Sequence, residues 1–340
     1  MRTITKIQLA LLDNLVWLLL LIFFIFNAFF TKNFFSVQNQ VNILYQTTAV
    51  GLLVLAQGIV MMVGELDLSL DSSLAFAPCV TILMSASMPW MNPVVSIVVT
   101  LTIGAAIGMF NGICISVMKA NSFLLTLSTQ IVMRGLVLFM IPFSIARLPF
   151  VYTYLGRGKV NAVFPVAIIA MLTIFVFFEF MFRKTIFGRK FLLTGGNRQA
   201  AFISGINTNK VITTAYVLAG VLAATAGLIS AGRQNAISNT MGTGLVMAAL
   251  TGSLLGGSSF SGGKGKPIGM LGGALLLGMI DNSLNLQGVN VNLVSASKGA
   301  LIFVAIMLDR ARVKLNAVIM HKENIRKLEK KPSQELGSRT

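Results

Sequence analysis

Long apolar stretches separated by short polar ones make up most of the chain. A helix needs about 20 apolar residues to cross the hydrocarbon core of a bilayer. Stretches that reach or approach this length occupy residues 13–31, 44–63, 72–88, 93–118, 122–143, 161–182, 210–232, 242–256, 267–287 and 292–308. The third and the eighth are short and rich in Ser, Gly or Ala, which is typical of tilted or broken helices buried by their neighbours. The pattern predicts an all-α polytopic membrane protein with about ten transmembrane helices, some of them short or broken.

The composition supports a membrane protein and argues against the other class that the charge suggests. The chain is 55% hydrophobic and 11% charged, whereas soluble domains contain about 25% charged residues. A formal net charge of +17 is a feature of nucleic-acid-binding proteins. However, the basic residues lie between apolar stretches and in a tail, and no RNA-binding signature or basic-aromatic face accompanies them. Membrane topology is sufficient to explain the charge.

The distribution of Lys and Arg predicts which side of the membrane each loop faces. With an even number of spans and the N-terminus inside, most Lys and Arg residues lie on the cytoplasmic side. Outside lie Lys32, Arg147, Arg157, Lys159 and Arg233, and within spans lie Arg134 and Lys298. This arrangement obeys the positive-inside rule. We therefore expect both termini in the cytoplasm, a transmembrane domain over residues 1–312 and a basic cytoplasmic tail over residues 313–340.

The longest polar interval between apolar stretches is the loop at residues 183–210, which contains basic residues and no acidic one. Within it, Asn197 can cap a short amphipathic helix that runs to Ser204, and Gly205 can end that helix in the left-handed conformation. A short helix held between two spans can act as a lever for a cytoplasmic partner. A solvated basic loop would explain the charge but not the glycines around the helix. Both interpretations stay open at this point.

Glycines recur at helical spacing in two of the predicted spans. They are Gly104, Gly108 and Gly112 in one span and Gly269, Gly273 and Gly278 in the other. Faces of small residues allow helix backbones to pack closely in lipid. Helices of one chain use this motif as readily as helices of two chains, so it does not predict a dimer.

Three acidic residues, Glu65, Asp67 and Asp71, lie in or next to the turn after the second span. Asp71 or Ser72 can cap the next helix, and Asp67 can accept hydrogen bonds from turn amides. A gate or a cation site is the functional alternative. Capping is the favoured interpretation, because a turn of mixed Asp, Leu and Ser residues is a poor cation cage.

Several polar or ionisable side chains lie inside predicted spans, where such groups usually face protein or water. Those that could line a polar pathway are Asn111, Gln130, Asp281, Asn282, Asn285 and Lys298. Asp281, Asn282 and Asn285 share one helix face, and Asp281 can pair with Lys298 in the next span. A structural ion pair that locks two helices is the alternative role. Arg134 and Glu179 lie nearer span ends, where their side chains can extend toward the headgroups.

The sequence offers no enzymatic site. His321, in the tail, is the only histidine, so no Ser/His/Asp set can be assembled, and no His/Cys/Glu cluster has metal-ligand spacing. Gly263-Lys264 fails as a P-loop, because Ser258 stands where the first glycine is needed and Gly265 where Ser or Thr would bind magnesium. We therefore expect no enzyme activity, metal or cofactor in this chain. If ATP drives transport, a partner subunit binds the ATP and magnesium.

Short motifs follow one another in a recognisable order along residues 45–312. The loop carries Phe187-Gly188-Arg189, Gly195-Gly196-Asn197, Ala200-Ala201 and Ser204-Gly205-Ile206, and other motifs are Gly64-x-Leu66-Asp67-Leu68-Ser69, Asn111-Gly112, Thr126-Leu127-Ser128-Thr129, Gly256-Gly257-x-Ser259-x-Ser261-Gly262-Gly263, Gly278-x-x-Asp281-Asn282-x-Leu284-Asn285-Leu286, Lys298-Gly299 and Asp309-Arg310. Together they resemble the permease subunits of bacterial ABC importers of the ribose and other monosaccharide class. Gln199 stands where the family's E-A-A-x-x-x-G element usually has its glutamate. Glu65 and Asp71 replace two glycines of the family's G-G-I-D-L-S-V-G-S turn.

The resemblance implies a multi-pass permease of the bacterial inner (plasma) membrane that imports a sugar or sugar-like solute. Asn197, Gln199, Ala200, Ala201 and Gly205 would then belong to a coupling helix that docks into an ATPase. The family's importers also contain a second permease chain, identical or not, two ATP-binding-cassette ATPase domains and an extracytoplasmic solute-binding protein.

Two other classes of protein compete with this interpretation. An ion-coupled secondary transporter would use Asp281 in the membrane as its cation site. A structural membrane scaffold would need no polar helix face. The solute also stays open, because ribose or another pentose, a hexose, a sugar alcohol and a furanosyl signalling molecule such as autoinducer-2 all fit the resemblance.

Overall fold

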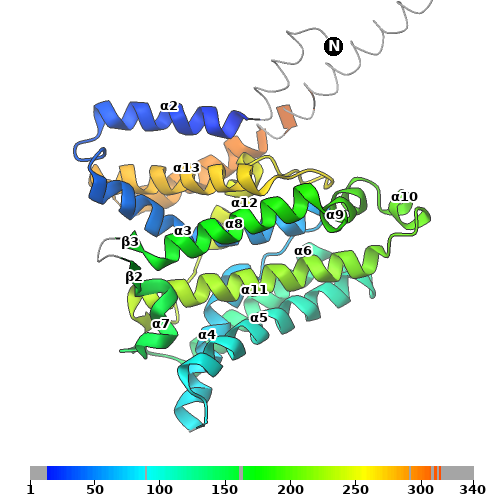
Figure 1. Ribbon diagram of the computed structural model, residues 1–340, viewed down its shortest axis with the longest axis horizontal. Helices are drawn as coiled ribbons and strands as arrows, with labels where there is room; N and C mark the ends of the chain where they lie inside the picture. Colours follow the sequence, from blue (N-terminus) through cyan, green and yellow to red (C-terminus); the bar gives the residue numbers. More distant parts are fainter. Residues whose placement is uncertain are drawn as a thin grey trace, which may run out of the picture.

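The computed structural model describes residues 14–88, 90–160, 164–290 and 292–307, together with 310, 311 and 314. This part of the chain is a bundle of helices (Figure 1). The helices are α2 (Leu15–Phe30), α3 (Val37–Met62), α4 (Leu70–Ser87), α5 (Pro93–Ser116), α6 (Ser122–Met140), α7 (Phe150–Arg157), α8 (Val166–Lys184), α9 (Ile186–Gly196), α10 (Arg198–Ile203), α11 (Thr208–Gln234), α12 (Leu245–Leu255) and α13 (Pro267–Leu286). A further apolar helix, Asn292–Met307, follows α13.

Each predicted span coincides with a helix of the structure. In the described part, 7 helices are long and apolar enough to cross a membrane, and the apolar helices α2, α12 and Asn292–Met307 are shorter. The prediction of an all-α polytopic protein with about ten spans, some of them short, is therefore confirmed. Almost all of the predicted tail at residues 313–340 lies outside the described residues.

Three spans begin three or more residues away from their predicted positions, and one of them is α8, which begins at Val166 instead of residue 161. α3 begins at Val37 instead of residue 44, because Ser36 caps it by accepting a hydrogen bond from the Asn39 N–H group at 3.3 Å. α12 begins at Leu245 instead of residue 242, because Gly244 has a left-handed backbone with φ 79°, which a right-handed helix excludes. The apolar pattern also missed α7 and α9, since each is too short to cross a bilayer.

Glycines bring α5 and α11 into direct backbone contact. A Cβ atom added at Gly108 would lie 2.1 Å from the Tyr216 carbonyl oxygen, and one added at Gly104 would lie 2.4 Å from the Gly220 oxygen. Gly269 and Gly273 bring α13 equally close to the backbone of α12. The predicted faces of small residues are thus used within the chain.

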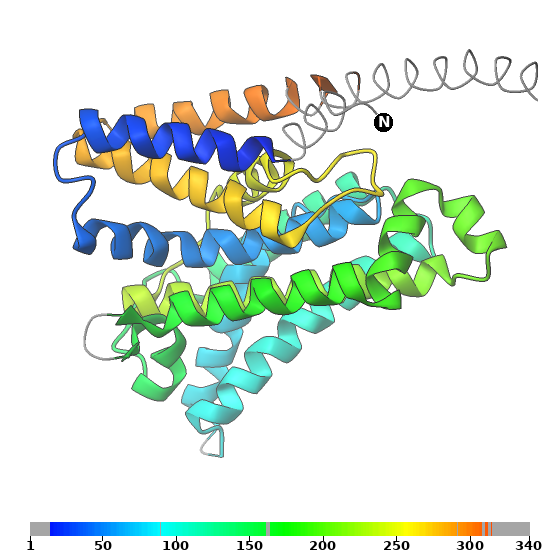
Figure 2. The ribbon, with the colours of Figure 1, turned by 45° about the horizontal axis from the view of Figure 1, so that its top comes forward.

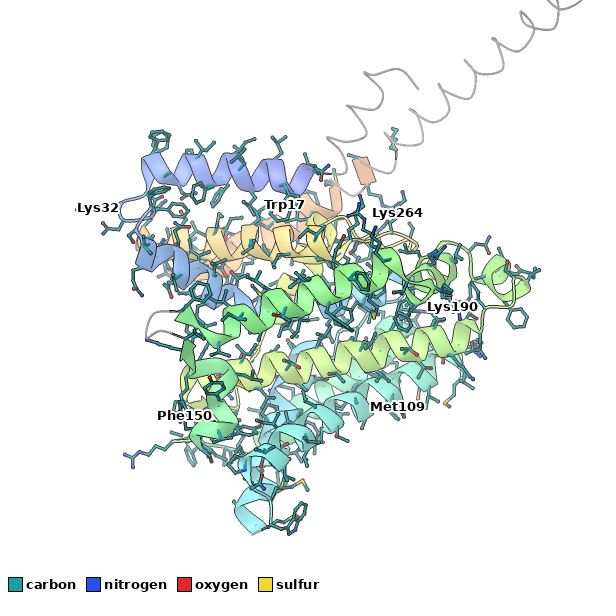
Figure 3. All side chains as sticks on the ribbon, viewed as in Figure 1. Trp17, Lys32, Met109, Phe150, Lys190 and Lys264 are labelled. Carbon is teal, nitrogen blue, oxygen red and sulfur yellow. The ribbon has the colours of Figure 1, made fainter. Side chains whose placement is uncertain are left out.

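The two ends of the bundle carry different elements. At one end, where Figure 3 places Lys32 and Phe150, two antiparallel strand pairs join loops: β1 (Ile145–Ala146) with β4 (Ala236–Ile237), and β2 (Lys159–Val160) with β3 (Phe164–Pro165). At the other end lie α9, α10 and the loop between α12 and α13 (Figures 2 and 3), with Lys190 and Lys264. We call this second end the basic end. The assignment of the basic end to the cytoplasm stays a prediction.

Candidate functional site

The predicted short helix in the basic loop is present as α10. The Ala200 N–H group donates to Asn197 Oδ1 at 2.9 Å, so Asn197 caps the helix as predicted. The chain leaves the helix through Gly205, whose φ of 79° places it in the left-handed region that a glycine adopts without strain. Of the helix side chains, Ala201 is buried, whereas Phe202 and Ile203 are 67% and 78% exposed. α10 therefore presents an apolar surface away from the bundle.

A groove of about 740 Å³ lies beside α10. Its lining consists of Lys119, Arg198, Gln199, Phe202, Gly205, Ile206, Asn207, Thr208 and Asn209. Lys119 lies in the loop between α5 and α6, and its Nζ atom donates to Asn209 Oδ1 at 3.0 Å. The groove thus combines two cations, several amides and one exposed aromatic ring, which suits contact with another protein.

An ion pair connects α10 to the turn between α3 and α4, which we call the 63–69 turn. Arg198, the first residue of α10, places Nη2 2.5 Å from Glu65 Oε1. The Glu65 side chain is 12% exposed and that of Arg198 is 39% exposed. Glu65 therefore faces a cation of the loop at residues 183–210.

The rest of the 63–69 turn belongs to a buried polar network. Asp67 Oδ1 accepts hydrogen bonds from the Ser69 N–H group at 2.8 Å and from the Ser69 hydroxyl at 2.6 Å. Asn111 Nδ2 donates to Ser69 Oγ at 3.0 Å, and the Thr129 hydroxyl donates to Asn111 Oδ1 at 2.8 Å. The Leu68 N–H group donates to the Thr126 hydroxyl at 3.0 Å. This network, Asp67–Ser69–Asn111–Thr129, ties the turn to α5 and α6 and confirms that Asp67 accepts from a turn amide.

Burial and hydrogen bonding act on the Asp67 carboxyl in opposite directions. Burial raises the pKa of Asp67 to about 6, because it disfavours the charged form, while the two hydrogen bonds from Ser69 lower it. The negative charge of Asp71 raises it slightly further. Burial is the dominant influence.

Asp71 does not have the predicted capping role. The N-cap position of α4 is Ser69, not Asp71 or Ser72. The Asp71 carboxylate, whose residue is 2% exposed, instead accepts hydrogen bonds from Gln130 Nε2 at 3.0 Å and from the Gly244 N–H group at 3.2 Å. Asp71 therefore joins α4 to α6 and to the start of α12.

Arg134 completes this cluster, and the expectation that it extends to the headgroups is wrong. Its Nη1 atom donates to the Met241 carbonyl at 2.9 Å and to the Asn239 carbonyl at 3.3 Å, and Nη2 lies 3.9 Å from Asp71 Oδ1. These carbonyls belong to the non-helical segment 238–244 that leads into α12. A backbone without helical hydrogen bonds needs such donors at membrane depth.

The candidates on α13 form a second group. Lys298 Nζ lies 2.9 Å from Asp281 Oδ2, which confirms the predicted ion pair across the last two spans. Asn282 and Asn39 of α3 exchange two amide hydrogen bonds at 3.0 and 2.9 Å. Asn285 is exposed. These contacts join α13 to α3 and to the helix Asn292–Met307, so they support the alternative role of locking helices together.

The six predicted pathway residues therefore divide into two groups. Asn111 and Gln130 contact residues at the start of α4, whereas Asp281, Asn282, Asn285 and Lys298 lie on the last two spans. Sequence reasoning missed the participation of Ser69, Thr129 and the segment 238–244. The Gly, Asn and Thr residues of that segment were the available signal, because they are unusual at the start of an apolar span.

Comparisons with known proteins agree with this architecture. A family described as "Branched-chain amino acid transport system / permease component" matches residues 39–307. The ribose import permease protein RbsC of Escherichia coli (strain K12) is 32% identical over 318 residues, which cover 92% of this chain and 97% of the relative. RbsC of Bacillus subtilis (strain 168) is 35% identical over 296 residues, 86% of this chain and 91% of the relative. The D-allose transport system permease protein AlsC of E. coli (strain K12) is 28% identical over 297 residues, 86% and 90% of the two chains. No solved structure matches the chain.

The matched residues and the helical bundle define a multi-pass membrane permease, and the chain belongs to this permease family. Its resemblance to the permeases of ATP-driven monosaccharide importers, inferred from the order of short motifs, is confirmed by these relatives. The comparisons give no support to the ion-coupled alternative.

Proposed function

We propose that the chain is the membrane permease of an ATP-driven importer that carries a monosaccharide into the cytoplasm. A partner ATPase binds ATP and Mg²⁺, a second permease chain completes the pathway, and an extracytoplasmic binding protein delivers the solute. Ribose is the first solute to test, because the two ribose import permeases are 32% and 35% identical to this chain and the D-allose permease is 28% identical. Autoinducer-2 and other sugars remain solutes for the same assay.

The observation that carries this proposal is the exposed apolar surface of α10. Phe202 and Ile203 project from a helix of only 6 residues that is capped at both ends by its own chain. Large exposed apolar side chains beside a groove mark a contact surface for a protein partner. The basic residues of this end support a cytoplasmic location for the surface under the positive-inside rule, where an ATPase can reach it.

The proposed cycle uses the contacts around the 63–69 turn. Closure of the ATPase domains on ATP moves α10, and the bundle then shifts between outward-open and inward-open arrangements. Asn111, Gln130 and the segment 238–244 are proposed to line the pathway, since polar groups at membrane depth face protein or water. Solute specificity resides in the binding protein.

Substitution of Ile203 by Asp tests the docking role of α10. Ile203 is 78% exposed in the isolated chain, so the aspartate does not disturb the packing of the bundle. In a docked complex the buried carboxylate would lack a partner, which typically costs several kcal/mol. We expect Ile203→Asp to lose co-purification with the partner ATPase, and to lose ATP-dependent uptake of labelled ribose.

Phe143→Asp is the matched control, because Phe143 is 84% exposed and lies beyond the end of α6 that is opposite to the basic end. This variant is expected to retain the ATPase. Gly205→Trp is a second test of the same region: no atom lies within 4 Å of an added Cβ, so the indole would extend into the docking region. The φ of 79° also strains a tryptophan, so this variant disturbs the end of α10 as well as the surface beside it. Normal ATPase association and uptake in both α10 variants would contradict the proposal.

A further inference from the structure

The loop that contains α10 depends on another part of the chain for its acidic partner. Residues 183–210 include no Asp or Glu. Glu65, at the end of α3, supplies the carboxylate that Arg198 contacts at 2.5 Å. A charged pair with one largely buried member has a strong directional preference, because the low local dielectric strengthens the attraction and solvent competes little.

Backbone contacts join the same two parts of the chain without intervening side chains. A Cβ atom added at Gly195, in the last turn of α9, would lie 1.9 Å from the Met62 carbonyl oxygen and 2.6 Å from the Gly263 nitrogen. The Gly263 N–H group donates to that Met62 oxygen at 3.0 Å. Close-packed backbones transmit a displacement better than flexible side chains, since they have no rotamers to absorb it. The end of α9, the end of α3 and the loop before α13 therefore meet at one point.

From the 63–69 turn, hydrogen bonds lead into the bundle. The Tyr216 hydroxyl of α11 donates to the Leu66 carbonyl at 2.7 Å. One residue further, Asp67 begins the buried network that reaches Ser69 and Asn111. The turn thus has the coupling helix on one side and, on the other, polar groups of the proposed pathway.

We propose that Glu65 and Arg198 are positioning residues that make α10 and the 63–69 turn move as one unit. This inference rests on the proposed function of the chain as an ATP-driven permease. The ion pair holds the first turn of α10 against the end of α3, so a displacement of α10 by the ATPase shifts the turn and the network attached to it. Loss of the pair leaves docking intact but lets α10 move without the turn.

The experiment uses the whole importer in proteoliposomes: the permease with its co-purified ATPase and binding protein. Uptake of radiolabelled D-ribose and ATP hydrolysis are measured in the same vesicles, so that solute moved per ATP hydrolysed is obtained directly. The variants are Glu65→Gln, Arg198→Gln and the exchange Glu65→Arg/Arg198→Glu. Arg183→Gln is the matched control, because Arg183 is an exposed cation at the start of the same loop. Its Nη1 atom lies 3.8 Å from Glu179 Oε1, so it forms an ion pair that does not involve α10 or the 63–69 turn.

Coupling between sites commonly corresponds to a factor of roughly 5–150, so each single variant is expected to lose at least about fivefold in ribose moved per ATP. The amount of ATPase bound stays unchanged in Glu65→Gln, because Glu65 does not line the groove beside α10, whereas Arg198 does. For the two variants that alter Arg198, ribose moved per ATP is compared at an equal amount of bound ATPase. The exchange restores the opposite charges and is expected to recover most of the loss, whereas Arg183→Gln resembles the unmodified protein. A merely structural role would lower transport and hydrolysis together and leave their ratio unchanged.

The inference is overturned if both single variants keep the normal ratio, if Glu65→Gln loses the ATPase, or if the exchange is no better than either of the single variants. Failure of the proposed function is a separate result. In that case the unmodified complex itself shows no ATP-dependent uptake of ribose or of any other monosaccharide tested.

Discussion

The contact between α5 and α11 allows a quantitative test of how the bundle is held together. Gly108→Ala adds one methyl group at a position where it would lie 2.1 Å from the Tyr216 carbonyl oxygen. Non-bonded atoms prefer separations of about 3.5 Å, so the two helices must move apart by more than about 1 Å at this point. The backbone cannot rotate out of the way as a side chain can. The neighbouring contacts at Gly104 and Gly112 are then loosened as well.

The magnitude follows from two opposing contributions. Overpacking of a close contact costs typically about 1–3 kcal/mol. Replacing Gly by Ala in a helix gains roughly 0.5–1 kcal/mol through backbone entropy. Gly135→Ala in α6 isolates the second contribution, because no atom lies within 4 Å of its added Cβ. The two variants are therefore expected to differ by about 1–3 kcal/mol in the free energy of unfolding, with Gly108→Ala the less stable.

The assay is thermal unfolding of the purified protein in one detergent, followed with a thiol-reactive fluorophore. Cys79 is fully buried and reacts only when the bundle opens, and the partly buried Cys114 is replaced by Ala in every variant so that it adds no signal. For a chain of 340 residues, a difference of about 2 kcal/mol corresponds to a Tm lower by roughly 3 °C for Gly108→Ala than for Gly135→Ala. Equal melting temperatures would show that the α5–α11 contact tolerates separation, and the interpretation of its glycines would be wrong.

Two further predictions use the same melting assay. Arg134→Met leaves the Asp71 carboxylate, which is 2% exposed, without its cation, and is expected to lower the free energy of unfolding by about 3–5 kcal/mol. The double variant Asp71→Asn/Arg134→Met is expected to lower it less. A double variant at least as unstable as Arg134→Met would refute this. The pKa of Asp67 is raised from 3.8 to about 6, so the stability linked to its protonated form is fully present below pH 3.8 and is lost as the pH rises through about 6. Asp67→Asn is expected to remove this decrease, and an unchanged pH profile would contradict the assignment.

The sequence predicted most of the helices because the bilayer imposes a minimum apolar length. The position of α10 was also predictable, since an Asn cap and a left-handed Gly stop are local signals that need no tertiary contact. α12 was placed only approximately, because its first predicted residues belong to a segment that Arg134 stabilises from another helix. Hydropathy does not register such a donor.

The partners of the candidate site residues were harder to predict. Asp281 and Lys298 were paired correctly because they lie on consecutive spans. Glu65 and Arg198 lie on elements that only the folded bundle brings together, so sequence spacing did not indicate their contact. Asp71 was assigned to its own helix, whereas its carboxylate reaches Gly244 on a segment far along the chain. A capping preference read from neighbouring residues does not show that a distant N–H group will take the carboxylate instead.

The placement of α3 has a mechanical consequence. Glycine contacts join α5 to α11 in one part of the bundle and α12 to α13 in the other. α3 packs against α11 and also against α12 and α13, so it contacts both parts. Its final residue, Met62, has its carbonyl oxygen next to Gly195 of the loop at residues 183–210. A small tilt applied there would act on a rod that both parts grip, and 26 residues of helix would carry it to the far side of the membrane. The two parts would then rotate relative to each other about the axis of α3.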